Sequence, residues 1–125
     1  MTIERKNYPH LEKPVGPYVH AVKYNGLLFL SGLTAFGSSA QKGSLPEQAD
    51  VIYSTLASIA AAENTDLTKI IKVTIYVTSL DDVEPLRAIL FKHYGSALPA
   101  SSLVQVSRLF SSDLKMEVEA VIAVQ

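Results

Sequence analysis

Short apolar and aromatic runs predict a β-hairpin near the N-terminus. The runs cover residues 19–24 and 27–31, and Asn25 and Gly26 lie between them. Asn-Gly accepts the positive φ angles of a type I′ turn, so the two strands are expected to pair through a two-residue turn. Residues 1–17 hold three of the six prolines and show no hydrophobic period, which predicts an irregular lead-in.

A first helix is predicted after a loop. Residues 32–43 are rich in small and polar side chains, which indicates a loop with room for a short strand near residues 34–36. Ser44 and Glu47 have the spacing of a capping box, which starts a helix, and Asn64 is a plausible end. The expected buried stripe consists of the apolar residues that recur at helical spacing: Ala49, Ile52, Leu56, Ile59 and Ala60.

A second helix is predicted between residues 82 and 95. Asp81 or Asp82 opens it, and Gly95 is well placed to end it. The residues expected on its apolar face are Val83, Leu86, Leu90 and Phe91.

Three further runs predict strands. Residues 70–77 are β-branched and aromatic, and residues 102–107 and 115–124 follow, with a turn around residues 111–113 between the last two. The expected order is β-β-α-β-α-β-β, an α+β pattern. A length of 125 residues, without a repeat or a linker, predicts one domain over residues 1–125.

Side-chain parity predicts a sheet with one apolar and one mixed face. The residues expected on the apolar face are Ile71, Val73, Ile75 and Val77 in one strand and Met116, Val118, Ala120, Ile122 and Val124 in the last strand. The two helices are expected to cover this face. The other face mixes apolar side chains with carboxylates and hydroxyls, so we expect a closed homo-oligomer that buries part of it. The alternative is a monomer with one solvated sheet face, which antiparallel sheets tolerate.

Composition narrows the function classes. Lys and Arg total 11 against 12 Asp and Glu, and the formal net charge of -1 does not favour attraction to nucleic acid or to an anionic membrane. The chain has no cysteine, which excludes disulfides, thiolate metal sites and a cysteine nucleophile. The first residues lack the apolar run of a signal peptide, and no run reaches the roughly 20 residues of a spanning helix, so a cytoplasmic protein is expected.

Glu117 and Glu119 are the main candidates for proton transfer. They are two residues apart in a predicted strand, so they share one face of a mostly apolar stretch. A carboxylate partly removed from water has a raised pKa and can transfer protons near neutral pH. The alternative is an exposed pair, or a pair neutralised by Lys72 and Lys115 across the sheet.

Three other residues are candidates for binding. Tyr18 follows a rigid Gly-Pro step, and its hydroxyl can bind a carboxylate or an amine, although packing is its more common role. Ser31 ends a strand but lacks the glycines of a nucleophile elbow, so it suits the wall of a cleft. Arg87 lies beside the apolar stripe of the second helix, either as a solvated residue or as a guanidinium that binds a carboxylate. The histidines lack the spacing of a metal site, so no metal is expected.

Five segments in a fixed order carry a family resemblance. They are residues 16–22 (GPYVHAV), 25–32 (NGLLFLSG), 71–77 (IKVTIYV), 99–109 (PASSLVQVSRL) and 116–120 (MEVEA). In their order and spacing they resemble the RidA family, also called YjgF, over almost the whole chain, from Val15 to Val124.

The resemblance implies a chorismate-mutase-like subunit and a homotrimer. The three mixed sheets would form a central barrel, with a small cleft at each subunit interface. Family members with the full motif hydrolyse reactive enamines and imines, such as 2-aminoacrylate, to a 2-keto acid and ammonia, without a cofactor or a metal. A glutamate near the C-terminus positions water, helped by a backbone carbonyl. By this resemblance Glu117 is the catalytic residue, and Tyr18, Ser31 and Gly32 belong to the substrate site. Leu103, which lies on the mixed face of the sheet, is also expected to contact the substrate.

The chain departs from the family pattern at one arginine. In the family, this arginine of a Pro-Ala-Arg-Ser motif holds the substrate carboxylate, whereas the motif here has Ser101. A serine cannot form the charge-assisted pair, typically worth about 1.5–3 kcal/mol, so substrate binding is expected to fall at least about tenfold. We hypothesise that Arg87, where asparagine is common in the family, replaces the guanidinium from another wall. The alternative is coincidence on a variable helix surface.

Two functions from different classes follow. One is a RidA-like deaminase for a small enamine or imine, and the other is a binding module that captures a small carboxylate metabolite without turnover. The family has also been associated with endoribonuclease activity and translation inhibition, but the charge balance and the lack of a basic strip or a histidine pair placed for RNA cleavage favour neither. The expected partners are therefore a small carboxylate or imine and further copies of the chain, not nucleic acid or a membrane.

Overall fold

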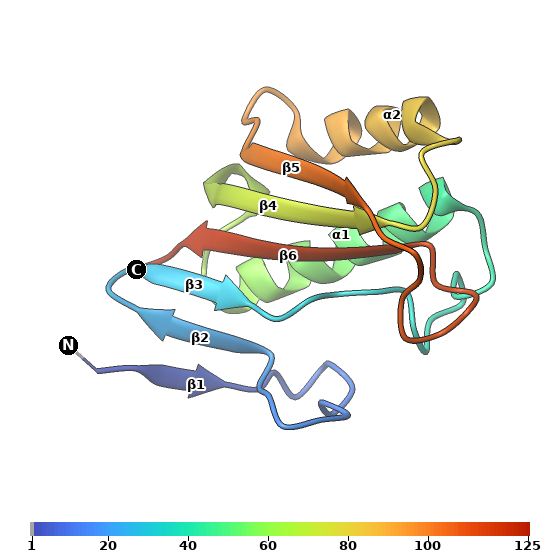
Figure 1. Ribbon diagram of the computed structural model, residues 1–125. Helices are drawn as coiled ribbons and strands as arrows, with labels where there is room; N and C mark the ends of the chain where they lie inside the picture. The colour runs from blue at the N-terminus through green and yellow to red at the C-terminus, as the bar shows by residue number, and fades with distance from the viewer. Residues whose placement is uncertain (1) are drawn as a thin grey trace.

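A mixed sheet of six strands forms the centre of the computed structural model, which describes residues 2–125 (Figure 1). The strands are β1 (Glu4–Lys6), β2 (Ala21–Tyr24), β3 (Leu27–Leu30), β4 (Ile70–Val77), β5 (Ala100–Gln105) and β6 (Met116–Ala123). The helices are α1 (Leu45–Ala62), α2 (Val83–Tyr94) and the short 3-10 helix η1 (Leu67–Lys69). The strand order is β1-β2-β3-β6-β4-β5, in which only β4 and β5 pair in parallel. The predicted α+β class is confirmed.

The predicted hairpin is present at β2 and β3. Asn25 and Gly26 have φ angles of +53° and +75°, the left-handed conformation that the Asn-Gly turn requires. The strands pair antiparallel, with Tyr24 opposite Leu27. The turn residues therefore fix the register of this part of the sheet.

The prediction of an irregular lead-in is wrong for residues 4–6. These residues form β1, which pairs antiparallel with β2 at one edge of the sheet. Two of the three side chains of β1 are exposed, so this edge strand carries no hydrophobic alternation that a sequence pattern could reveal. Residues 34–36 do not form the short strand considered for them; instead Leu33 makes an isolated bridge with Val118.

A β-bulge at Ile71 reverses the predicted face of the first residues of β4. Ile70 pairs with Ile122, whereas Lys72 pairs with Val121, so one extra residue lies between the two pairs. Ile70 is consequently buried and Ile71 is 46% exposed, opposite to the strict alternation that was expected. Beyond the bulge the strand has the predicted faces.

The capping box of α1 is formed as predicted. Ser44 Oγ accepts a hydrogen bond from the Glu47 amide, and the Glu47 carboxylate accepts one from the Ser44 amide at 2.8 Å. The helix ends at Ala62, and Asn64 follows in the left-handed conformation with φ +62°. These local bonds place the helix start directly after the loop that follows β3.

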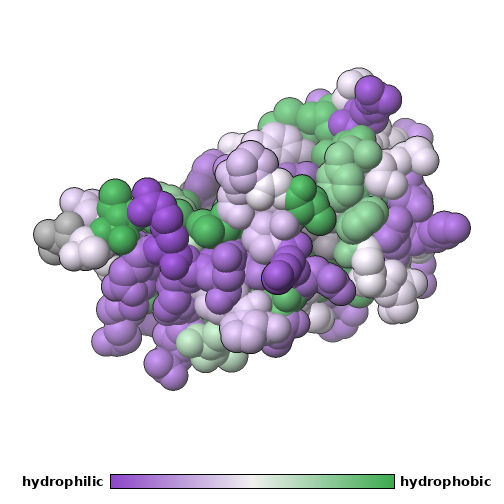
Figure 2. Space-filling view, turned by 90° about the horizontal axis from the view of Figure 1, so that it is seen from below, coloured by the Kyte–Doolittle hydropathy of each residue, from purple (hydrophilic) through white to green (hydrophobic). Residues whose placement is uncertain are grey.

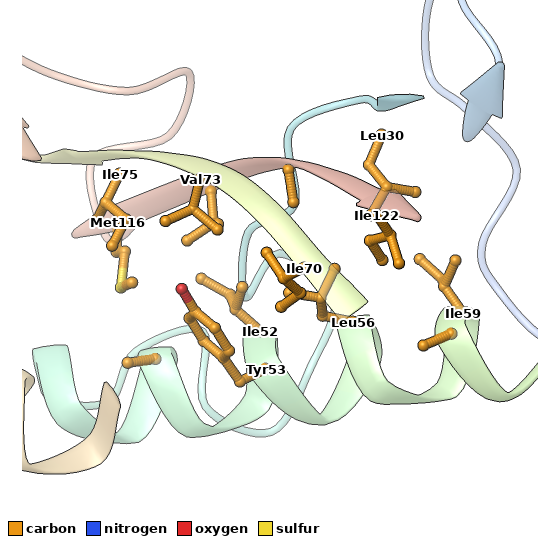
Figure 3. Packing of buried hydrophobic residues seen from close by; sticks show 14 of the residues in the cluster. Leu30, Ile52, Tyr53, Leu56, Ile59, Ile70, Val73, Ile75, Met116 and Ile122 are labelled. Atoms are coloured by element: carbon orange, nitrogen blue, oxygen red, sulfur yellow. The ribbon is translucent and has the colours of Figure 1, made fainter. Parts of the chain in front are cut away.

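The core lies between α1 and the central strands. Figure 3 shows Ile52, Leu56 and Ile59 on α1 pointing toward the sheet, with Ile70 and Ile122 on the facing strands. All five are buried, at 6% exposure or less. Apart from Ile71, the apolar sheet face predicted from parity is therefore the face that α1 covers.

The predicted apolar face of α2 is only partly correct. Leu86 is buried, but Phe91 is 59% exposed, because α2 packs beside α1 and not squarely over the sheet. The hydroxyl of Tyr94 bonds to that of Tyr53, which joins the two helices in the interior. Gly95 ends α2 as predicted, with φ +61°. No helix in the described part of the chain has both the length and the apolar character to cross a membrane.

Candidate functional site

A cavity of about 610 Å³ lies where the lead-in, the end of β3, the loops that precede α1 and β6, and one side of α1 meet. Its volume is in the range of small-molecule sites. It brings together four of the residues proposed from the sequence, Tyr18, Ser31, Gly32 and Glu117. The wall of this cavity is therefore assembled from segments that lie far apart in the chain.

Two short backbone interactions bring Glu117 to Gly32. The chain leaves β3 after Leu30, and the amides of Leu33 and Val118 donate to each other's carbonyls at 2.8 and 3.0 Å. Glu117 precedes Val118 in β6 and points to the face opposite the helices. The bridge therefore sets its carboxylate against Gly32, in the cavity.

The surroundings of Glu117 favour a bound proton. Burial raises the pKa of its carboxyl above the ordinary value, and the negative charge of Glu119 raises this pKa further. The ion pairs formed within residues 2–125 include neither glutamate. Lys72 donates to the Ser102 hydroxyl at 3.0 Å and Lys115 donates to a backbone carbonyl at 2.7 Å, so neutralisation of the pair by these lysines is wrong. Glu117 is thus the group in the cavity suited to proton transfer.

Ser31 and Tyr18 form part of the cavity wall. Ser31 Oγ donates to the Val19 carbonyl at 2.6 Å, so its proton is directed away from the cavity and its lone pairs stay available. This arrangement agrees with a wall residue and not with a nucleophile. Tyr18 is 48% exposed, and its amide donates to the Gly16 carbonyl at 2.9 Å in a tight turn.

The other three predicted residues do not reach this cavity within one chain. Arg87 lies on α2 with its side chain 56% exposed and forms an ion pair with Glu84. Ser101 and Leu103 are on β5, the edge strand, which is separated from β6 by β4. A role for any of them beside Glu117 would require a second copy of the chain.

Two histidines, His10 and His20, line the cavity, although the sequence pattern did not indicate that they lie near each other. His20 Nδ1 accepts from the Tyr8 amide at 2.9 Å, and its Nε2 donates to the Glu12 carbonyl at 2.8 Å. His10 Nε2 is bonded to the Ser58 hydroxyl at 3.0 Å. These bonds use both ring nitrogens of His20, so the histidines hold the lead-in in place. Within residues 2–125, no group of three or more metal-ligating side chains is placed to hold a metal ion.

A buried carboxylate anchors the lead-in to the end of α1. The Glu63 side chain is 4% exposed; it accepts from the Tyr8 hydroxyl at 2.8 Å and pairs with Lys6 at 2.6 Å and Lys23 at 3.8 Å. Burial opposes its ionisation, but the bonds from Lys6 and Tyr8 and the two lysine charges outweigh this effect and lower the pKa of Glu63. The sequence offered no signal for this anchor, because its members are up to 57 residues apart (63 − 6). The anchor fixes one side of the cavity.

Comparisons with known proteins agree on one family. The model of the family described as Endoribonuclease L-PSP matches residues 9–124. A RutC family protein of Pyrococcus horikoshii is 30% identical over 112 residues, which cover 87% of this chain and 88% of that protein. Reactive Intermediate Deaminase A, chloroplastic, of Arabidopsis thaliana is 30% identical over 110 residues, which cover 86% of this chain and 58% of that protein. The crystal structure of yeast Mmf1 has the same fold, with a TM-score of 0.89 at 22% identity over 99% of this chain and 100% of that one.

Proposed function

Because the chain belongs to the RidA family, also called YjgF, we propose that it is an enamine and imine deaminase, which hydrolyses a small 2-imino acid to a 2-keto acid and ammonia. The observation that carries the proposal is the position of Glu117. Its carboxyl group lies in the cavity beside Ser31 and Gly32, and burial raises its pKa. A relative named Reactive Intermediate Deaminase A supports this assignment.

Glu117 would move a proton in each half of the reaction. An enamine substrate first takes a proton on carbon from the protonated carboxyl group, which converts it into the iminium ion, the protonated imine, and leaves Glu117 as the carboxylate. Water then adds to the imine carbon; the carboxylate takes the proton of the water as the new C–O bond forms, and the C=N electron pair moves to nitrogen. The carboxyl group then returns this proton to nitrogen. As the C–N bond breaks, the carboxylate takes the remaining proton of the new hydroxyl group, which forms the carbonyl of the keto acid, releases ammonia and restores the protonated carboxyl group. One water is consumed, and the raised pKa increases the fraction of Glu117 that is protonated at a given pH.

We further propose that a second copy completes the cleft, in a homotrimer. Apolar side chains remain exposed on β3 and β5, where Phe29 is 44%, Leu103 is 37% and Val104 is 41% exposed. Burying such side chains against another copy stabilises an assembly. In that assembly, Ser101 and Arg87 of a neighbouring copy are the candidates for contact with the substrate carboxylate.

A second candidate function is capture of a carboxylate metabolite without turnover. Ser101 favours it, because it stands where the family resemblance implies an arginine that holds the carboxylate. Without the guanidinium, the cavity retains a proton-transfer group but loses an anion contact.

Trapping with semicarbazide distinguishes the two functions. An amino acid oxidase generates 2-iminobutyrate in solution, and semicarbazide converts the imine into a semicarbazone that is followed by absorbance. A deaminase at a small fraction of the imine concentration lowers the rate of semicarbazone formation. A binding protein lowers it only in proportion to the amount of protein added, so a titration of the protein separates catalysis from capture.

A cytoplasmic location also remains a proposal from the sequence. Fractionation of cells that carry the tagged full chain tests it, and recovery in an organelle or a membrane fraction would contradict it.

A further inference from the structure

Two phenylalanines form an exposed aromatic pair in the wall of the cavity. Phe36 is in the loop after β3 and Phe110 is in the loop before β6, and both line the cavity that contains Glu117. Their ring centroids are 5.1 Å apart with an interplanar angle of 60°. They are 50% and 63% exposed, so the protein core does not account for their position. The pair offers apolar area to a molecule in the cavity.

A buried amide on α1 holds the two loops together. The Gln48 side chain is fully buried; its Nε2 donates to the Gln41 carbonyl at 2.9 Å and the Asp113 carbonyl at 2.8 Å. Its Oε1 accepts from the Lys115 amide at 2.8 Å. The Gln41 side chain adds a contact to the Asp113 carboxylate at 3.3 Å. The two loops are therefore fixed relative to each other, which reduces the cost of ordering the aromatic pair on binding.

The apolar part of the wall is larger than a short imino acid needs. Its side chains are Leu11, Val15, Leu33, Phe36, Val51 and Phe110. Figure 2 views the molecule from below Figure 1; hydrophilic side chains cover much of the end nearer the N-terminus, with a few hydrophobic groups among them, and more hydrophobic groups lie toward the opposite end. A cavity of about 610 Å³ with this lining leaves room for an apolar substituent after the amino and carboxyl ends of the substrate are placed near Glu117.

We propose that Phe36 and Phe110 form a subsite for the substrate side chain, which selects 2-imino acids with aromatic or branched apolar side chains over those with a methyl or ethyl group. This inference rests on the proposed function. The aromatic rings supply contact area only to a substrate whose side chain extends beyond the reacting carbon. The preference among substrates therefore depends on the size of the side chain, while the hydrolysis step is the same for all of them. Specificity of this kind arises from apolar contact, which discriminates by about 10-fold to 200-fold for each added methylene.

The test compares imines of different size at fixed chemistry. An amino acid oxidase generates the imines of phenylalanine and of alanine, and semicarbazide trapping gives the kcat/KM ratio for the two. We expect a ratio of at least about tenfold in favour of the aromatic imine, and Phe36→Ala and Phe110→Ala each lower it about tenfold. Phe91→Ala is the matched control, because the exposed fraction of Phe91, 59%, lies between those of Phe36 and Phe110, but Phe91 is on α2 outside the cavity. A ratio near one in the unmodified protein, or a ratio unchanged in both cavity variants, overturns the proposal.

Binding of the products separates this inference from the proposed function. Isothermal titration with phenylpyruvate and pyruvate needs no turnover, and the same preference and the same two losses are expected. If the preference appears in binding while no imine is hydrolysed, the subsite stands and the deaminase fails. If both imines are hydrolysed equally, the deaminase stands and the subsite fails. Sedimentation of the variants supplies a third outcome: a changed association state with an unchanged ratio would make the pair a contact between copies and overturn the subsite.

Discussion

A β-carbon on residue 32 would lie 2.0 Å from Oε2 of Glu117, so the carboxylate occupies space that only glycine leaves free. The φ angle of Gly32 is not in the left-handed region, and glycine is therefore needed here for space and not for backbone conformation. Leu33 and Val118, the residues that follow Gly32 and Glu117 in the chain, pair with each other and keep the two backbones at this separation. The position of the Glu117 carboxylate in the cavity therefore depends on glycine at residue 32.

Gly32→Ala should displace Glu117 while the fold persists. The added methyl group contacts a flexible side chain, so we expect a loss of about 1–3 kcal/mol in the free energy of unfolding. Imine hydrolysis should fall at least about tenfold, because the displaced carboxylate no longer meets the substrate in the productive geometry. Denaturant unfolding and the trapping assay measure the two effects.

The double variant tests whether the loss acts through Glu117. In a Glu117→Gln background, Gly32→Ala should cause little further loss of activity, since the proton-transfer group is already absent. A full additional tenfold loss would show that residue 32 acts on the substrate by itself.

Stability should depend on pH through Glu117 in an identifiable direction. Its folded-state pKa is raised, so ionisation destabilises the folded protein, and the stability of the protonated form is lost as pH rises through that pKa. We expect Glu117→Gln to be more stable than the unmodified protein at pH 7, and the difference to shrink as the pH falls to the ordinary carboxyl range. Unfolding in denaturant over pH 4 to 8 measures it, and a Gln variant that is less stable at pH 7 would contradict the assignment.

Glu63→Gln should loosen the lead-in. The amide still accepts from Tyr8 but no longer pairs with Lys6, which we expect to cost about 2–4 kcal/mol. The folded pKa of Glu63 is lowered, so its stabilising contribution is present above the ordinary carboxyl pKa and is lost as pH falls through the lowered value. The gap between the two proteins should therefore close in acid. Glu4→Gln, an exposed change on β1, is the control and should leave the free energy of unfolding nearly unchanged.

Gln48→Leu should release both loops from α1. Leucine fills a similar volume but leaves the carbonyls of Gln41 and Asp113 and the amide of Lys115, which are partly buried, without the partner that Gln48 provides, and we expect a loss of about 3 kcal/mol. Hydrogen exchange should accelerate at the backbone amide of Lys115, because this amide donates a hydrogen bond to Gln48 in the unmodified protein. An unchanged exchange rate at that amide would contradict the conclusion that Gln48 holds the two loops together.

The sequence predicts best those parts of the fold whose cause is local. Asn25-Gly26 determines its own turn, and Ser44 with Glu47 determines the start of α1, because each pattern contains all of the groups that form the bonds. The bulge at Ile71 and the edge strand β1 depend on pairing with a distant strand, and no period of the hydrophobic pattern reports them.

The same distinction applies to the candidate site. Strand parity placed Glu117 and Glu119 together in a mostly apolar stretch, and the local sequence suggested Tyr18 and Ser31 as binding residues. The resemblance then singled out Glu117 and added Gly32. The aromatic pair and the hydrogen bonds of Gln48 connect loops that are tens of residues apart in the chain, and the spacing of residues in the sequence cannot reveal such contacts. A role for Arg87 or Ser101 at the cavity depends on the proposed homotrimer, so both roles remain predictions.

The most direct measurement compares Glu117→Gln and Glu119→Gln with the unmodified protein in the 2-iminobutyrate trapping assay at neutral pH. The two glutamates are on the same face of β6, but only Glu117 lines the cavity, whereas Glu119 is exposed and accepts from the Tyr76 hydroxyl at 2.9 Å. We predict catalytic diversion of the imine by the unmodified protein, retained by Glu119→Gln and reduced at least about 100-fold in Glu117→Gln. Equal rates of semicarbazone formation with and without protein, or full activity in Glu117→Gln, would contradict the account.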